Sequence, residues 1–333
     1  MTSERSVLNR ISRAVLSAGA SGAGRVLLGI GDDAAILKPR RGRELVISSD
    51  FLIEGVHFLS SYPPKAIGYK ALARAVSDLA AMGAEPLGFL LNLALPSGRT
   101  GQWLGGFLSG VNDAARKIRI LLIGGDLATF EKAAVCVVVL GDGKPGRLIR
   151  RQGARPGDLI YVSGKLGAAR LGLEIIRQRQ DKRRDAPLLV APHYYPQPRL
   201  KLGAWLADQR LATAMMDISD GLSIDLARLC EASQVGAILN AERLPIVGIP
   251  GQWRRRLNLA ASEAQNYALN GGDDYELLFT VPKRQVGKLR HPPGGIPLTC
   301  IGEITKSEDL VLVDSKRQAS LLKPKGWDHF QRR

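Results

Sequence analysis

The feature that most constrains the fold is the alternation of short apolar runs with longer amphipathic segments. Residues 87–95 and 133–140 form runs rich in branched apolar side chains, which predict buried strands. From residue 65 to residue 82, apolar side chains recur at helical spacing, and Gly83 follows as a helix stop. Strands that alternate with helices indicate an α/β (α+β) protein.

The same patterns predict the other elements and a domain boundary. We expect strands at residues 44–49, 118–123, 159–163, 277–281 and 299–304 and one running into Asp217, and helices at residues 102–117, 168–178, 197–209 and 223–233. A chain of 333 residues exceeds the size of most single cores. Residues 150–158 are polar, basic and rich in turn formers, so we place the boundary there and predict domains at residues 1–150 and 151–333.

Composition excludes several classes of protein. Hydrophobic residues make up 45% of the chain, which argues against disorder. The three cysteines are far apart and form no CxxC pair, so we expect neither a disulfide framework nor a zinc site, and a reducing, cytoplasmic setting fits. We see no signal peptide and no apolar run of roughly 18 residues, so no membrane association is expected.

The chain is strongly basic, with a net charge of +16 and a pI near 10.1. Such a charge fits nucleic-acid binding, a field that attracts anionic small substrates, or a merely solvated surface. The basic residues are dispersed and lack interleaved aromatic side chains, which disfavours a nucleic-acid partner.

A glycine-rich segment, Gly29-Ile-Gly-Asp-Asp-Ala34, formally matches the GxGxxA pattern of dinucleotide-binding loops. A pyrophosphate cradle uses backbone amides at a helix N-terminus, whereas this loop carries two carboxylates. Pro39 and the basic stretch after it interrupt any long helix. The loop is therefore a weak candidate for dinucleotide binding.

Carboxylates recur beside glycines, on turns or near the ends of predicted strands. They are Asp32, Asp33, Asp50, Asp126, Asp217, Asp220, Asp273 and Asp274, while Asp78 lies inside the helix expected at residues 65–82. Each one alone fits a turn or a helix cap, as Asp217 and Asp220 do before the helix at residue 223. Together they fit magnesium ions bridged by nucleotide phosphates, because Mg²⁺ prefers hard oxygen ligands. The chain has no P-loop and no protein-kinase motif set.

Taken in order, these segments resemble those of the thiamine-monophosphate kinases, in the superfamily of aminoimidazole ribonucleotide synthetase. The resemblance covers residues 29–35, 47–52, 55–58, 76–84, 123–126, 156–158, 217–222, 271–278 and 326–330. The most specific parts are Ser77-Asp-Leu-Ala-Ala-Met-Gly-Ala84 and Gly271-Gly-Asp-Asp-Tyr-Glu-Leu-Leu278.

The resemblance implies a two-domain architecture and a phosphotransferase. Domain 1–150 is expected to bind ATP and magnesium and to form a homodimer through its sheet, and the α/β domain 151–333 to close the active-site cleft. The implied reaction is ATP-dependent phosphorylation of thiamine monophosphate to thiamine diphosphate by direct in-line transfer, with several Mg²⁺ ions. The attacking phosphate oxygen is already anionic, so no catalytic residue beyond the metal ligands is expected.

The resemblance also assigns site residues. The expected magnesium ligands are Asp33, Ser48, Ser49, Asp50, Asp78, Asp126, Asp217 and Asp220; the ATP contacts are Gly125, Asp126, Arg151 and Ser219; the thiamine-phosphate contacts are His57, Asp273 and Trp327. For His57 a structural role weighs about equally. Two positions depart from the family: Asp273 replaces the usual Glu, and Leu127 replaces the usual Thr.

Other functions remain as alternatives. Selenophosphate synthetase needs a reactive cysteine or selenocysteine in an N-terminal glycine-rich segment, whereas the first cysteine here is Cys136. The hydrogenase-maturation relative carries a C-terminal cysteine, whereas the sequence here finishes Gln331-Arg-Arg333. The charge also leaves open a non-catalytic nucleotide- or RNA-binding protein.

Overall fold

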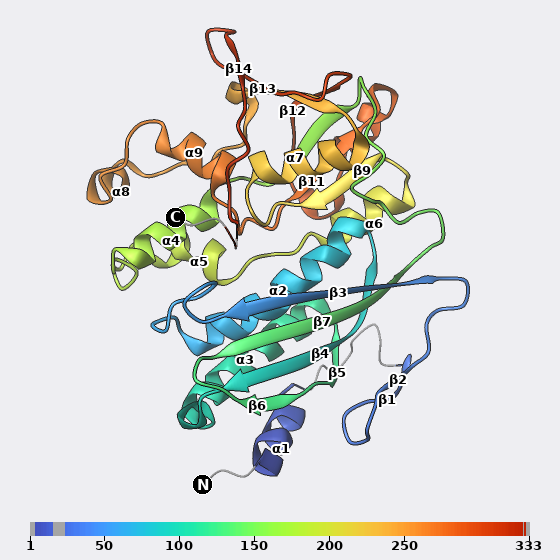
Figure 1. The fold of residues 1–333 in the computed structure, drawn as a ribbon, viewed down its shortest axis with the longest axis vertical. Helices are drawn as coiled ribbons and strands as arrows, with labels where there is room; N and C mark the ends of the chain where they lie inside the picture. Colours follow the sequence, from blue (N-terminus) through green and yellow to red (C-terminus); the bar gives the residue numbers. More distant parts are fainter. Residues whose placement is uncertain (1–3, 16–23, 329, 331–333) are drawn as a thin grey trace. The chain divides into compact units, whose positions relative to one another are not determined.

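The computed structural model describes residues 4–15, 24–328 and 330, so His329 of the segment 326–330 lies outside the described residues. The chain divides into two compact units (Figure 1). The first contains Met1–Leu79 and Ala84–Gly146, and the second contains Ala80–Gly83 and Arg147–Arg333. The second unit starts its main span close to the change in sequence texture at residue 150, while the roles expected for the two domains stay predictions.

The first unit carries two long helices and a mixed sheet. Its elements are α1 (Glu4–Ala14), β1 (Val26–Leu28), β2 (Ile36–Leu37), β3 (Glu44–Ile53), α2 (Pro64–Met82, with its last turn in the second unit), β4 (Glu85–Leu95), η1 (Ser97–Arg99), α3 (Gln102–Ile118), β5 (Leu121–Gly124), β6 (Leu127–Thr129) and β7 (Ala134–Gly143). The strand order is β3-β7-β4-β5, and β6 pairs with β4. β1 and β2 form a separate two-stranded hairpin.

The register of this sheet separates a buried face from an exposed one. β7 runs antiparallel to both β3 and β4, and Val138 pairs with Ser49 on one side and Leu90 on the other. Along β3, Val46 and Leu52 are buried, whereas Leu45, Ile47 and Phe51 are exposed. Successive side chains of a strand point to opposite faces. One face of the sheet is therefore covered, and β3 leaves apolar side chains on the other.

Helices α2 and α3 pack together along the covered face of the sheet (Figure 1). A Cβ added at Gly68 would lie 2.0 Å from the Phe107 carbonyl oxygen, and one at Gly110 would lie 1.9 Å from that of Lys65. The two glycines therefore permit a backbone approach that any larger residue would block. Val76, on the buried side of α2, is fully excluded from solvent.

The second unit is built on a seven-stranded sheet. Its elements are β8 (Leu159–Ser163), α4 (Ala168–Arg177), α5 (Pro187–Tyr194), α6 (Leu200–Asp208), β9 (Ala214–Asp217), α7 (Leu222–Ser233), β10 (Gly236–Asn240), η2 (Ala241–Arg243), α8 (Gly251–Arg256), α9 (Glu263–Asn270), β11 (Leu277–Val281), η3 (Lys283–Arg290), η4 (Pro293–Gly295), β12 (Leu298–Thr305), β13 (Leu310–Val313) and β14 (Ala319–Leu321). The strand order is β14-β13-β10-β12-β8-β11-β9.

Both faces of this second sheet are covered where β11 runs. Leu278 belongs to one hydrophobic core with Leu226 of α7, whereas its neighbour Phe279 belongs to another with Leu206 of α6. All five residues of β11 are buried. A strand covered on both faces is apolar throughout rather than alternating, which explains the unbroken apolar character of this segment.

Several predicted boundaries were wrong, among them the end of the strand expected at residues 133–140, which continues to Gly143. The strand expected at residues 118–123 begins only at Leu121, because Arg119 adopts a left-handed conformation (φ 64°) and caps α3. The strand expected at residues 44–49 continues to Ile53, so Asp50 lies within a strand rather than beyond its end. The helix expected from residue 197 begins at Leu200.

Among the described residues, none of the helices is both long and apolar enough to cross a membrane.

Candidate functional site

Two of the predicted metal ligands line one cavity of the first unit. The cavity has a volume of about 890 Å³ and is bounded by α1, the Gly29–Ala35 loop, β4 and the end of β5. Asp33 comes from the loop between β1 and β2, and Asp126 follows β5; both residues are exposed. The fold therefore places two acidic residues, 93 positions apart in the sequence, in the lining of the same cavity.

Gly125 lies against β4 at the wall of this cavity. A Cβ at this position would lie 2.0 Å from the carbonyl oxygen of Leu91, and the residue has φ 155°. The backbone N–H of Leu93 donates a hydrogen bond to the carbonyl of Asp126 at 2.9 Å. The glycine thus lets the chain lie directly on β4, and the hydrogen bond from Leu93 fixes the backbone of Asp126.

Three more predicted ligands lie between β3 and α2. Ser48 donates a hydrogen bond to Asp78 at 2.5 Å, and Arg74 holds both carboxylate oxygens of Asp50 at 2.9 and 3.1 Å. Ser48 and Asp50 share one face of β3, and Arg74 and Asp78 lie four residues apart on α2. Ser49 lies on the opposite, exposed face of β3. The sequence interpretation missed Arg74, although its spacing from Asp78 was a usable signal.

His57 is held in the turn that follows β3. The ring Nδ1 accepts a hydrogen bond from the backbone N–H of Ile53 at 3.0 Å. The backbone N–H of His57 donates to the carbonyl of Ile53 at 2.8 Å. Nδ1 is therefore committed to the turn and acts as an acceptor, which requires any proton on a neutral ring to be on Nε2. This contact supports the structural role that the sequence left open, while a substrate contact stays a prediction.

In the second unit, backbone hydrogen bonds bring four predicted site residues together after β9. The N–H of Asp273 donates to the carbonyl of Ser219 at 2.7 Å, and the N–H of Trp327 donates to the carbonyl of Asp220 at 3.0 Å. Asp217, at the end of β9, is buried with 5% exposure. Segments about 50 and 100 residues apart thus meet at one loop.

Asp225 organises that loop and was missed by the sequence analysis. Its Oδ2 accepts hydrogen bonds from the backbone N–H groups of Ser219, Asp220 and Gly221 at 3.0–3.1 Å. The N-cap residue of α7 is Gly221, so neither Asp217 nor Asp220 occupies the N-cap position that we had considered for them. An acidic residue in the first turn of a helix was the available signal.

Arg228 links the two carboxylates of this loop. It donates to Asp220 at 2.5 Å and to Asp225 at 2.9 Å. Burial and the charge of Asp220 raise the pKa of Asp225 to about 6, although the backbone hydrogen bonds oppose the shift. The charged side chains of Asp220, Asp225 and Arg228 therefore surround the backbone of Ser219.

The Gly271–Glu276 segment has an uncommon backbone. Gly272, Asp273 and Tyr275 all have positive φ, at 68°, 60° and 51°. Such conformations are rare for residues other than glycine and collect at functional sites. The Tyr275 hydroxyl donates to the Asp273 carboxylate at 2.9 Å, which fixes the shortened side chain that departs from the family pattern.

Asp274 anchors this segment to the start of α4. The carboxylate of this half-buried residue accepts hydrogen bonds from the N–H groups of Gly167 and Ala169, at the start of α4. Burial raises the pKa of Asp274 to about 7, and the two backbone donors only partly oppose this. The next charged residue, Glu276, is held by Arg199 and by Ser163. Neither anchor was predicted from the sequence.

Arg151, the predicted ATP contact at the start of the second unit, is exposed. Its carbonyl accepts a hydrogen bond from the Ser233 hydroxyl at 3.1 Å, which fixes the backbone and leaves the guanidinium at the surface. The position is compatible with an anion contact.

The acidic residues do not form a complete metal site by themselves. Over residues 4–15, 24–328 and 330, no three Asp, Glu, His or Cys side chains are grouped so that they could hold a metal ion. The exposed oxygens of Asp33 and Asp126 nevertheless fit magnesium, which commonly takes one or two carboxylates and completes its shell with waters and substrate phosphates. The ligand roles of the full set stay predictions.

Comparison with known proteins agrees with this architecture. Residues 31–142 match the family model of the N-terminal domain of AIR synthase related protein, and residues 155–315 match that of its C-terminal domain. The chain is 38% identical over 309 residues to the thiamine-monophosphate kinase of Escherichia coli (strain K12), and the match covers 92% of each chain.

Solved structures give the same result. The thiamine-monophosphate kinase from Stenotrophomonas maltophilia K279a has a TM-score of 0.80 at 37% identity, over 91% of this chain and 94% of that one. AaThiL complexed with AMPPCP and TMP has a TM-score of 0.77 at 31% identity, over 98% and 97% of the two chains. With both domain models matched in order and close relatives aligned along nearly the whole length, this chain belongs to the thiamine-monophosphate kinase family.

Proposed function

We propose that this protein is a kinase that transfers the γ-phosphoryl group of ATP to thiamine monophosphate and forms thiamine diphosphate and ADP. The observation that carries the proposal is the likeness to AaThiL, a relative complexed with the ATP analogue AMPPCP together with TMP, along 98% of this chain. The segments that resemble the family most specifically, residues 77–84 and 271–278, fall within the aligned span of both domain models.

The chemistry needs charge neutralisation and alignment more than proton transfer. The acceptor is a phosphate oxygen that is anionic near neutral pH, so the reaction has little use for a general base. The main obstacle is the repulsion between two polyanions. The basic character of the chain, with a net charge of +16, favours the approach of both substrates.

We propose magnesium as the partner of the acidic residues. When bound, it would supply electrostatic stabilisation of the phosphoryl group in flight. In the first unit, Asp33 and Asp126 would bind an ion at their cavity, and Ser48, Ser49, Asp50 and Asp78 are proposed as further oxygen donors on β3 and α2. In the second unit, the proposed ligands are Asp217 and Asp220. Asp50 is already neutralised by Arg74, so it would need to exchange this partner for a cation.

The remaining predicted contacts have distinct tasks. Gly125 holds its loop directly against β4, where we propose that its backbone contacts ATP. In the second unit, Arg151 and Ser219 would provide a positive charge and a polar contact for ATP. Asp273 and Trp327 converge on the loop after β9, where the carboxylate and the indole suit the cationic rings of thiamine. His57 would contribute through Nε2, since Nδ1 is occupied by Ile53.

We also propose a homodimer formed through the exposed face of the first unit's sheet. On β3, Leu45, Ile47 and Phe51 are 49%, 61% and 58% exposed. Val138 of β7 and Leu90 of β4, both half-buried, pair in the same cross-strand row as Ser49, so apolar side chains continue from β3 onto the two neighbouring strands. A contiguous apolar patch of this kind is typical of a protein interface.

The three free cysteines fit a cytoplasmic setting, which we propose as well.

A panel of acceptors tests the function. Purified protein is incubated with ATP, Mg²⁺ and either thiamine monophosphate, free thiamine, or the monophosphates of unrelated vitamins, and ADP release is measured. We expect turnover with thiamine monophosphate and its loss when EDTA removes the metal. Turnover of free thiamine without turnover of its monophosphate would refute the assignment.

A further inference from the structure

We propose that Asp142 is a positioning residue that clamps the base of the β1–β2 hairpin and so places the carboxylate of Asp33 in the cavity. The proposal rests on the proposed function for its effect on turnover, but the clamp itself can be tested without it. Asp142 belongs to β7 and lies outside every segment that the sequence analysis connected with function.

The hairpin cannot hold its own shape. β1 has three residues and β2 has two, and they form a separate sheet with an irregular register. An isolated two-stranded hairpin is marginally stable at best, and strands this short contribute few hydrogen bonds. The loop between these strands carries Asp33, so an external anchor decides how precisely that carboxylate is placed.

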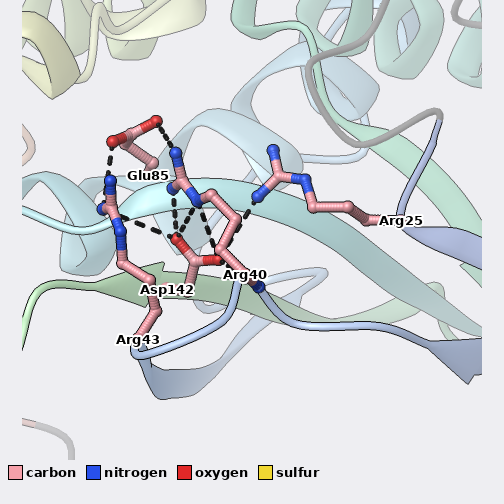
Figure 2. Close-up of polar contacts among 5 residues, drawn as sticks. All are labelled: Arg25, Arg40, Arg43, Glu85 and Asp142. Atoms are coloured by element: carbon pink, nitrogen blue, oxygen red, sulfur yellow. Dashed lines mark hydrogen bonds and ion pairs between the residues drawn. The ribbon is translucent and has the colours of Figure 1, made fainter.

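Both ends of the hairpin segment contact Asp142, through Arg25 and Arg40 (Figure 2). Arg25, directly before β1, donates to Oδ2 at 3.2 Å. Arg40, three residues after β2, donates from Nε to Oδ1 and Oδ2 at 2.9 and 3.1 Å. The N–H of Lys38 closes the same end by donating to the Arg25 carbonyl at 2.7 Å. One carboxylate thus joins the two ends of the segment that carries the loop.

The anchor point is rigid. β7 is paired on both sides, and Asp142 lies opposite Leu45 of β3 and Glu85 of β4. The Asp142 side chain is fully buried, whereas those of Arg25 and Arg40 are 18% and 28% exposed. The arginines therefore bring the hairpin to a fixed carboxylate near the end of an inner strand, and a buried charge of this kind requires its partners.

Charge and hydrogen bonding favour the ionised anchor. Burial raises the pKa of Asp142, but the hydrogen bonds and charge of Arg40 and the charge of Arg25 outweigh it, so the pKa lies below its ordinary value. Glu85 accepts from Arg40 at 2.6 Å and from Arg43 at 3.2 Å, which orients the guanidinium of Arg40 (Figure 2). Arg25 pairs with Asp142, whereas Glu85 pairs with Arg40 and Arg43, so substitutions at the two carboxylates remove different contacts.

The experiment compares Asp142→Asn, Arg25→Gln and Glu85→Gln with a matched control. The control is Asp113→Asn, which breaks the surface ion pair with Lys65 in the same unit but leaves the hairpin untouched. Hydrogen exchange is followed by mass spectrometry on peptides from residues 24–43 and from β4 and β7. The kcat and the KM for magnesium-ATP are measured in parallel.

We expect amides of the hairpin to exchange about tenfold faster in Asp142→Asn, with those of β4 and β7 within about twofold of wild type. Arg25→Gln should show the same change with smaller amplitude, Glu85→Gln less again, and the control none. Because Asp33 is misplaced rather than removed, the KM for magnesium-ATP should rise about tenfold in Asp142→Asn, by more than kcat falls.

Each outcome is decisive. Unchanged hairpin exchange in Asp142→Asn overturns the clamp. Faster exchange with an unchanged KM overturns the positioning role and leaves a purely structural one. If Asp142→Asn unfolds globally, Arg25→Gln decides, because it removes one arm and leaves the buried carboxylate paired with Arg40. A wild-type protein without kinase activity refutes the proposed function, while the exchange data still decide the clamp.

Discussion

The backbone N–H of Asp273 donates a hydrogen bond to the carbonyl of Ser219 at 2.7 Å. This bond joins the loop after β9, where an ATP contact is expected, to the segment before β11, where a contact with thiamine monophosphate is expected. A main-chain hydrogen bond thus connects the two expected binding regions. A displacement of either segment should therefore affect both substrates.

Gly125→Ala tests the close approach of the chain to β4. The new methyl group would lie 2.0 Å from the carbonyl oxygen of Leu91, so the backbone must move, at a cost of about 1–3 kcal/mol. We expect a lower free energy of unfolding and a large loss of kcat. Gly98→Ala is the control, because a Cβ there meets no atom within 4 Å. Equal stability of the two variants would contradict the packing argument.

Asp126→Asn tests the metal hypothesis. The side chain is exposed and lines the cavity, so the substitution should leave the melting temperature almost unchanged. Loss of an electrostatic contact to the transferring phosphoryl group should lower kcat about 100-fold or more. The measurement is steady-state turnover at several magnesium concentrations. Near-normal activity would exclude Asp126 from the metal site.

Trp327→Ala tests the thiamine contact. Loss of stacking on a cationic ring is worth about 0.5–2 kcal/mol, so the KM for thiamine monophosphate should rise about 2- to 30-fold. The KM for ATP should not change. Trp327→Phe keeps an aromatic face and should recover part of the affinity. A change in the KM for ATP alone would show that the indole serves a different substrate.

Asp274 should make stability depend on pH. Its pKa is raised to about 7 in the folded protein from 3.8, so between these values the folded state binds a proton that the unfolded state has released. Stability should therefore fall as pH rises from about 4 to about 7, by a few kcal/mol at most. Asp142 has a lowered pKa and acts below this window.

Urea unfolding at pH 5, 6.5 and 8 checks this sign. Asp274→Asn removes the titration, so the wild type should lose stability relative to the variant as pH rises. The carboxamide retains one acceptor for the two donors at Gly167 and Ala169, so an offset at all pH values is expected as well. Parallel curves for the two proteins would show that Asp274 stays ionised throughout.

The sequence predicted those parts of the fold whose pattern is local. The helix from residue 65 ends where Gly83 follows it, and the apolar run at residues 277–281 is β11, an inner strand that pairs with β8 and β9. α5 was missed because Pro192 lies inside it and interrupts the helical pattern. Arg119 was placed in a strand because its left-handed conformation has no signature in a non-glycine residue.

The candidate site was predictable only in its recognisable motifs. The carboxylates of Asp33 and Asp126 stood out beside glycines, and the structure places both on one cavity. Asp142 and Asp225 did not stand out, because their partners are distant arginines or main-chain amides that only the folded chain brings to them. Residues that hold a site in place thus have weaker sequence signals than residues that face it.

Transfer of a labelled phosphoryl group tests the central claim most directly. The protein is incubated with thiamine monophosphate, Mg²⁺ and ATP labelled at the γ-phosphoryl group, and the products are separated and counted. We predict that the label appears in thiamine diphosphate, with one ADP formed for each diphosphate. Label found in inorganic phosphate alone, or on an acceptor other than thiamine monophosphate, would contradict the account.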